Sequence, residues 1–211
     1  MDVPPGFDAN LILVLNLIGT FVFGLSGALA ATRARLDVLG VLVMASVVGL
    51  AGGVMRDLLI GIPPATIRDW RYLAAAGLAG LVCFWASGHL QRFRRSVLIV
   101  DAFGLGLFAV TGATKAVLVG MGVVPSILLG LMTGVGGGLL RDVLLREVPT
   151  VLREGLYAVP ALLAATITVV AQKAGSTSPV FPVVAALACV VLRLAALRWR
   201  IRLPRPRKVG S

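Results

Sequence analysis

Long apolar stretches alternate with short polar segments along the chain. Within each stretch, hydrophobic residues occupy nearly every position, so neither the alternation of a half-buried strand nor the single stripe of a surface helix is visible. Backbone polar groups cannot stay unpaired in lipid, and a helix satisfies them within its own segment. A helix of about 20 residues crosses the apolar core of a bilayer. We therefore expect seven membrane-spanning helices, at residues 11–31, 38–60, 72–88, 97–119, 122–145, 155–171 and 180–197.

The composition agrees with this pattern. Of 211 residues, 58% are hydrophobic and 14% are charged, whereas about 25% of the residues of a soluble domain are charged. A water-soluble globule is therefore excluded. The length holds about seven or eight spans with short loops, which leaves no room for a separate catalytic domain.

The net charge of +11 would suggest nucleic acid binding in a soluble protein, but its distribution favours membrane topology. If the spans alternate, one side of the membrane receives most basic residues, and the other receives Arg68, Arg71, Lys173 and the acidic N-terminus. Cytoplasmic loops are rich in Lys and Arg, so we expect the N-terminus outside, the C-terminus in the cytoplasm and no nucleic acid partner. The basic tail either fixes this topology or also binds anionic lipid. The residues expected on the cytoplasmic side are Arg33, Arg35, Arg92, Arg94, Arg95, Arg146, Arg153, Arg198, Arg200, Arg202, Arg205, Arg207 and Lys208.

The sequence repeats itself at a distance of 85 positions, and the pattern Gly-Gly-x-x-Arg-Asp at 52–57 recurs at 137–142. Each copy holds three spans, so the second copy enters the membrane upside down. We therefore predict an all-α membrane protein with an inverted three-plus-three repeat and an extra seventh helix. Inverted repeats occur in many transport proteins, although duplication can also merely fill a membrane with helices. The expected organisation is an extracytoplasmic segment at 1–10, a first repeat at 11–90, a second repeat at 97–174, a seventh helix at 180–198 and a cytoplasmic tail at 199–211.

Glycines gather in the second and fifth spans. Each costs about 1 kcal/mol in a helix interior, so a run of three predicts a bend or break near mid-membrane. A break frees carbonyl groups, which are natural cation ligands when they face a water-filled cavity. Packing of small residues between helices is the secondary explanation. The glycines expected at the kinks are Gly49, Gly52, Gly53, Gly134, Gly136, Gly137 and Gly138.

The Arg-Asp pairs carry the candidate chemistry. Neighbouring residues do not face each other on a helix, so we expect Arg56, Asp57, Arg141 and Asp142 each to have a partner elsewhere. Ionisable groups at membrane depth suggest function. The alternative is a pair of salt bridges at the membrane interface that close the kinks.

Other polar residues follow the repeat. Asn16 is equivalent to Asp101, and Ser26 is equivalent to Thr111. Inward-facing hydroxyl groups would replace part of the hydration shell of a cation, or they would bond back to their own helix. Lys115 lies late in the fourth span, where it would snorkel outward or act as a positive gate.

Seven spans, the inverted repeat and the doubled Gly-Gly-x-x-Arg-Asp pattern resemble the trimeric intracellular cation (TRIC) channel family, over residues 10–197 and in its prokaryotic branch. The resemblance implies a homotrimer with a pore in each protomer, lined by the first, second, fourth and fifth spans. It also implies passive conduction of monovalent cations, chiefly potassium and also sodium, and a prokaryotic plasma membrane. Related bacterial sequences are labelled glycine transporters, so a carrier for glycine or another small zwitterion is the alternative.

Within that channel, the acidic residues of the repeats would favour cations, and Arg56, Arg141 and Lys115 would set barriers or gates. A third function class is a lipid-binding structural protein held by the basic tail. The sequence has one His and two Cys, which are too few for a typical zinc site. We expect no metal site, no cofactor and no enzymatic activity.

Overall fold

Helices form almost all of the chain that the computed structural model describes, namely residues 9–90, 96–153, 156–176, 178, 180–199 and 201. Five of these helices are long and apolar enough to cross a membrane, and α4 and α8 are shorter apolar helices. Together they lie at the seven apolar stretches of the sequence, and the expected fold class is confirmed. The helices are α1 (Ala9–Arg33), α2 (Val38–Ile60), α3 (Ala65–Arg68), α4 (Trp70–Leu90), α5 (Ser96–Leu118), α6 (Val123–Leu144), α7 (Thr150–Arg153), α8 (Ala158–Lys173) and α9 (Val180–Trp199).

Several expectations fall outside the described residues. These are most of the N-terminal segment 1–10, Arg92, Arg94 and Arg95 after α4, and most of the tail 199–211. The expected start of the sixth span at residue 155 is also outside them.

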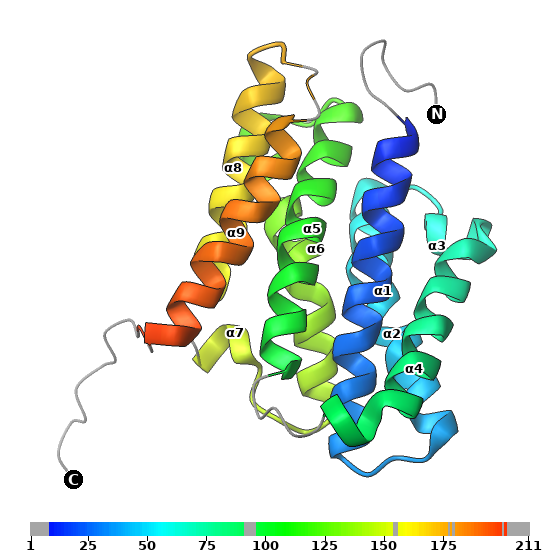
Figure 1. The fold of residues 1–211 in the computed structure, drawn as a ribbon. Coiled ribbons are helices and arrows are strands. Elements are labelled where there is room, and N and C mark those ends of the chain that lie inside the picture. The colour runs from blue at the N-terminus through cyan, green and yellow to red at the C-terminus, as the bar shows by residue number, and fades with distance from the viewer. Residues whose placement is uncertain are drawn as a thin grey trace, which may run out of the picture.

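The helices pack as two equivalent groups. In the first group α1 packs against α2 and α4, and in the second α5 packs against α6 and α8. Figure 1 shows α1 and α5 side by side and running in opposite directions, so one group is turned over relative to the other. Contacts of α1 with α5 and of α2 with α6 join the groups, and α9 lies outside this pairing, against α5 and α8.

Equivalent turns of the two groups share their backbone geometry. The residue in the left-handed region is Gly61 after α2 (φ 78°) and Arg146 after α6 (φ 59°). It is Arg35 after α1 (φ 58°) and Gly120 after α5 (φ 84°). Each pair is 85 positions apart. These turns use the left-handed cap that commonly ends a helix.

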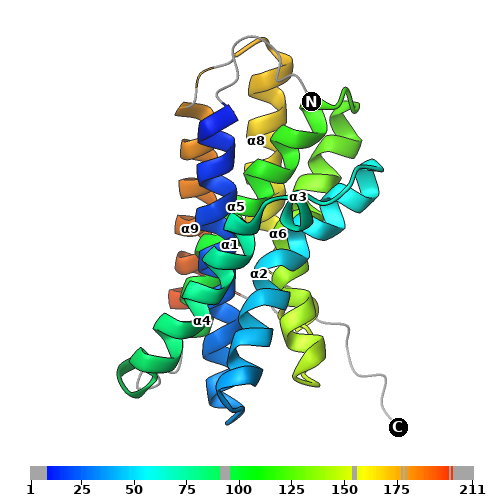
Figure 2. The same cartoon turned by 90° about the vertical axis from the view of Figure 1, so that its right-hand side faces the viewer.

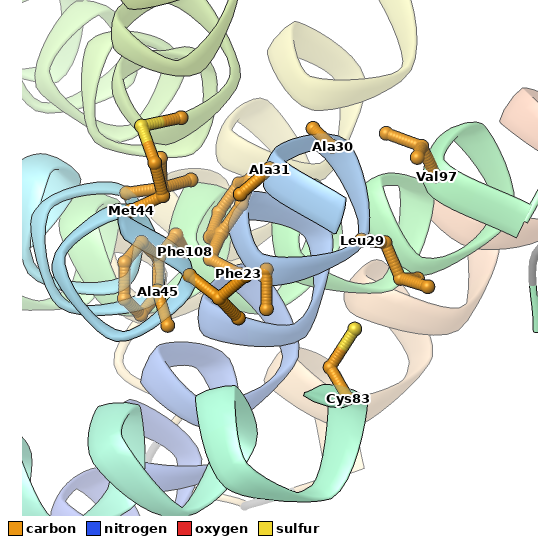
Figure 3. Close-up of a cluster of buried hydrophobic side chains, with 12 residues drawn as sticks. Phe23, Leu29, Ala30, Ala31, Met44, Ala45, Cys83, Val97 and Phe108 are labelled. Atoms are coloured by element: carbon orange, nitrogen blue, oxygen red, sulfur yellow. The ribbon is translucent and has the colours of Figure 1, made fainter. Parts of the chain in front are cut away.

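Phe23 and Phe108 meet in the core where the two groups join. They are equivalent in the repeat, their ring centroids are 5.1 Å apart, and the ring planes are tilted by 52°. Both side chains are buried, and Figure 3 shows them among small apolar residues of the central cluster. Glycines of the opposite group make room for each ring: Gly104 and Gly137 face Phe23, and Gly19 and Gly52 face Phe108.

Of the bend or break expected at the glycine runs, the break is absent from both helices. Both α2 and α6 are continuous helices across their glycines, although the axis of α2 changes direction along its length in Figure 2. A continuous helix keeps its carbonyl groups bonded, so the freed ligands expected from the sequence do not form there.

Close packing, the secondary explanation from the sequence, accounts for the run of three glycines. A Cβ on Gly136 would lie 2.7 Å from Met55, and one on Gly137 would lie 2.9 Å from the carbonyl oxygen of Val48. A Cβ on Gly138 would lie 3.0 Å from Asp101. Successive helix residues point about 100° apart, so α6 is crowded on three faces at this level.

Gly49 and Gly134 make a matching pair of close approaches. A Cβ on Gly49 would lie 2.7 Å from the carbonyl oxygen of Thr20, and one on Gly134 would lie 2.9 Å from that of Leu105. Gly53 differs, since its Cβ would make only ordinary contacts, at 3.8 Å and beyond.

Candidate functional site

A buried polar cluster lies near the end of α2. Arg56 donates one hydrogen bond to Asp57 (Nε to Oδ1, 2.7 Å) and one to Asn16 of α1 (Nη1 to Oδ1, 2.9 Å). The other carboxylate oxygen of Asp57 accepts from the backbone N–H of Ala65 at the start of α3 (2.9 Å). The ammonium of Lys115 from α5 reaches the first oxygen of Asp57 at 2.7 Å. We call these five residues the first cluster.

A second cluster repeats this arrangement near the end of α6. Arg141 donates to Asp142 (Nε to Oδ1, 2.8 Å) and to Asp101 of α5 (Nη1 to Oδ1, 2.5 Å). The other oxygen of Asp142 accepts from the backbone N–H of Thr150 in α7 (2.7 Å) and from its hydroxyl group (2.8 Å). Arg141 also donates to the hydroxyl oxygen of Ser26 in α1 (2.6 Å).

Each shared contact of the two clusters is displaced by 85 positions along the chain. In both, a short helix outside the spans supplies a backbone N–H to the aspartate, and the arginine ties its own helix to the first helix of its group. The four Arg and Asp side chains are at most 5% exposed. Breaking one member of such a buried pair costs about 3–5 kcal/mol, because the partner is left charged and buried. The clusters therefore fix the helices that carry them.

The clusters differ in charge. Asn16 of the first cluster is neutral, whereas Asp101 of the second is acidic. Lys115 adds a positive charge to the first, and its equivalent beside the second is Ala30. Formal charges thus sum to +1 for the first cluster and −1 for the second.

The structure adds a contact to one expectation about these side chains and decides between the alternatives for another. Arg56 and Arg141 do bind their immediate neighbours, because the long arginine side chain curls back to the adjacent carboxylate, and each also has the expected partner elsewhere. Lys115 does not snorkel outward but turns inward to Asp57, with 19% of its side chain exposed.

Ser26 and Thr111 occupy equivalent positions but make different contacts. The Thr111 hydroxyl donates to the carbonyl oxygen of Phe108 in its own helix (3.5 Å), so the back-bonding alternative holds there. Ser26 instead binds Arg141.

A pocket of about 330 Å³ opens beside the second cluster. It lies between the ends of α1 and α6, at the side of the bundle that carries Arg33 and Arg35. Carboxylate, hydroxyl and guanidinium groups line its polar part, and small or aliphatic side chains line the rest. The lining residues are Ala30, Arg33, Ala34, Val97, Leu98, Arg141, Asp142, Leu145, Glu147 and Thr150.

Two buried polar residues behind the second cluster were missed. Tyr157 of the turn before α8 is 1% exposed, and its hydroxyl lies close to Gly138. Arg193 of α9 is also 1% exposed, lies 4.7 Å from the centre of the Tyr157 ring, and donates to the carbonyl oxygen of Leu156 (3.3 Å). The signal for Arg193 was present, since a charge inside an apolar stretch is costly.

Metal ligands do not gather in the described part of the chain, where no three His, Cys, Asp or Glu residues lie together. Cys83 and Cys189 are buried and reduced, as expected for small apolar side chains.

The fold and the clusters define a class: an all-helical membrane protein made of two equivalent helix groups, each closed by a buried Arg-Asp cluster. A family model described as "Glycine transporter" matches residues 13–87 and 98–173, and the chain belongs to this family.

Relatives and solved structures agree over most of the chain. The "UPF0126 membrane protein" of Streptomyces coelicolor is 48% identical over 92% of this chain and 90% of its own length. The "UPF0126 inner membrane protein YadS" of Escherichia coli is 34% identical over 92% and 95%. A TRIC trimeric intracellular cation channel orthologue from Rhodobacter sphaeroides superposes with a TM-score of 0.86 at 34% identity, over 91% of this chain and all of that one. The resemblance to prokaryotic TRIC channels is confirmed.

Proposed function

We propose that the protein is a passive channel for monovalent cations, chiefly potassium and also sodium. The observation that carries this proposal is the pair of equivalent Arg-Asp clusters, one near the C-terminal end of α2 and the other near the C-terminal end of α6. The similarity to cation channels of the same fold supports it. Ionisable side chains inside a membrane commonly mark ion pathways.

The proposed path lies within one protomer, between α1, α2, α5 and α6. It enters from one side at the pocket beside Asp142 and leaves past Asp57 and Lys115. At the centre, the Phe23 and Phe108 rings fill the space between the helix groups, so conduction requires these rings to move. The close glycine contacts support a narrow waist here, which replaces the carbonyl-lined kink expected from the sequence.

Charge differences assign separate roles to the two clusters. The excess carboxylate of the second cluster attracts cations, and Lys115 raises the barrier for cations at the first. Lys115 is therefore the proposed gate, since its ammonium must leave Asp57 or remain as a fixed positive charge beside the path.

The two helix groups, residues 11–90 and 97–174, are the proposed repeat units of this channel. Residues 180–198 add α9 to the second unit. We further propose a homotrimer in the inner membrane with the N-terminus outside and the tail 199–211 in the cytoplasm. The basic turns support this orientation through the positive-inside rule.

The test is purified protein in planar bilayers between unequal concentrations of potassium chloride. A cation channel shifts the reversal potential towards the potassium equilibrium value, and protein-free bilayers give the baseline. Lys115→Met keeps the length of the side chain without its charge and is expected to raise the unitary conductance. Absence of current, or a reversal potential at zero, contradicts the proposal.

The rival function is a carrier for glycine or another small zwitterion. Its support is the description of the family model and a pocket lined by both Arg33 and Glu147, which offers opposite charges to the two ends of such a molecule. Saturable glycine counterflow in liposomes, without unitary current steps, establishes the carrier instead.

A further inference from the structure

The pocket beside Asp142 and the side chain of Lys115 occupy equivalent places in the two halves of the molecule. Ala30 lines the pocket, and the residue 85 positions later is Lys115. The Lys115 ammonium lies 2.7 Å from an Asp57 oxygen. In the second half the same aspartate position, Asp142, faces an open pocket because alanine leaves the space of the lysine side chain free.

The pocket is also more polar than the equivalent place in the first half, which the Lys115 side chain fills. Arg33, Glu147 and Thr150 line it, where the first half has Leu118, Ile62 and Ala65 at the same repeat positions. Carboxylate and hydroxyl oxygens are the ligands preferred by hard cations.

The charges around the pocket favour a cation. Arg33 and Glu147 are exposed at its mouth and offset each other. Further in lie Arg141, Asp142 and, behind the arginine, Asp101, which together carry one excess negative charge. Asp101 is fully buried, and its second carboxylate oxygen has no hydrogen-bond partner among the described residues.

We infer that the pocket binds one monovalent cation beside Asp142, Glu147 and Thr150, and that the Lys115 ammonium is its covalently attached counterpart at Asp57. The inference deepens the proposed function, on which it rests, because it places the permeant ion at one end of the path only. The repeat thus holds a free cation at one end and a tethered one at the other.

The test measures binding of potassium without relying on current. Purified protein is titrated with potassium chloride against N-methylglucamine chloride at constant ionic strength, and the melting temperature is followed. The wild type is expected to gain stability saturably with potassium. Ala30→Lys, which places an ammonium in the pocket, is expected to melt higher without potassium and to lose the potassium response.

Two further variants keep the result interpretable. Ala30→Met fills the pocket without a charge and is expected to lose the potassium response without the gain in melting temperature. Glu147→Gln changes an exposed side chain and is expected to weaken potassium binding about threefold, as for other partly exposed charge pairs. This variant tests the site if Ala30→Lys does not fold.

An unchanged potassium response in Ala30→Lys, or in Glu147→Gln when the former cannot be made, overturns the site. The experiment distinguishes failure of the binding site from failure of the channel function. Cation-selective currents in the wild type with an unchanged response leave the channel standing without the site. Loss of the response in Ala30→Lys without wild-type currents leaves the site standing without the channel.

Discussion

The ring of Phe23 packs against the ring of Phe108, its own counterpart in the second half of the chain, with 5.1 Å between the ring centroids. Each ring lies over glycines of the opposite helix group. The contact therefore lies where the two halves of the repeat meet. A substitution of one ring can be compared directly with the same substitution of the other.

Substitution of either phenylalanine by leucine is expected to raise the unitary conductance by a similar factor, because each removes one of two equivalent rings from the proposed waist. The stability loss is expected to be about 1 kcal/mol in both cases, as for apolar replacements of similar volume. Single-channel recording and thermal melting check this. Phe84→Leu, on a partly exposed ring of α4, is the control and leaves conductance unchanged. Opposite changes in Phe23→Leu and Phe108→Leu would refute the shared role.

Gly137→Ala is expected to destabilise the protein by about 1–3 kcal/mol, the usual effect of overpacking. Its Cβ would lie 2.9 Å from the Val48 carbonyl oxygen and 3.0 Å from the Phe23 ring. Gly77→Ala in α4 is the matched control, since nothing lies within 4 Å of its Cβ, and it is expected to gain up to about 1 kcal/mol from helix propensity. Melting in detergent compares them, and equal effects would argue against close packing.

Arg141→Met is expected to destabilise the protein more than Arg56→Met. The first leaves Asp101 and Asp142 without their shared guanidinium, at a cost of about 3–5 kcal/mol. The second leaves only Asp57, which keeps Lys115 as a partner. Adding Asp101→Asn to Arg141→Met is expected to restore part of the loss. The free energy of unfolding in detergent measures these differences, and a larger loss in Arg56→Met would contradict the charge assignment.

Asp101→Asn is expected to lower the potassium-to-chloride permeability ratio, because it gives the second cluster the neutral side chain of the first. Asn16→Asp makes the reverse exchange and is expected to raise the ratio. Reversal potentials in unequal potassium chloride measure both effects. If neither variant moves the ratio, the clusters do not set selectivity.

Cysteines at Pro63 and Val148 test the proposed orientation. Both positions are exposed, equivalent in the repeat and at opposite ends of the bundle. In a Cys83→Ala, Cys189→Ala background, a charged membrane-impermeant thiol reagent applied to intact cells is expected to label Pro63→Cys and not Val148→Cys. Opened cells give the control, in which both are labelled, and the reverse pattern in intact cells would invert the topology.

Much of the site could be predicted because the duplication leaves a direct mark on the sequence. Arg56 and Arg141 stand out as charges in apolar stretches, and their common offset shows that Asn16 and Asp101 are equivalent. Phe23 and Phe108 are separated by the same offset. They could not be singled out from the sequence, because their neighbours are also apolar.

The packing role of the glycine runs was ranked second for a related reason. Helix propensity describes the cost of glycine within one helix. The gain is close packing against neighbours such as Val48 and Met55, whose positions the sequence alone does not show. The contact between Lys115 and Asp57 was not predicted, because it depends on how α5 packs against α2, which the sequence alone does not show.

The four equivalent turns at Arg35, Gly61, Gly120 and Arg146 have one further consequence. All four have left-handed backbone, which costs a residue with a side chain about 1–2 kcal/mol. Glycine avoids this cost at one end of the bundle, whereas arginine occupies both turns at the other. Arginine at these turns makes the local backbone less stable than glycine would. Its positive charge, however, resists transfer across the bilayer during insertion. In the proposed orientation, the two least favourable backbone positions of these turns therefore both carry a positive charge on the cytoplasmic side.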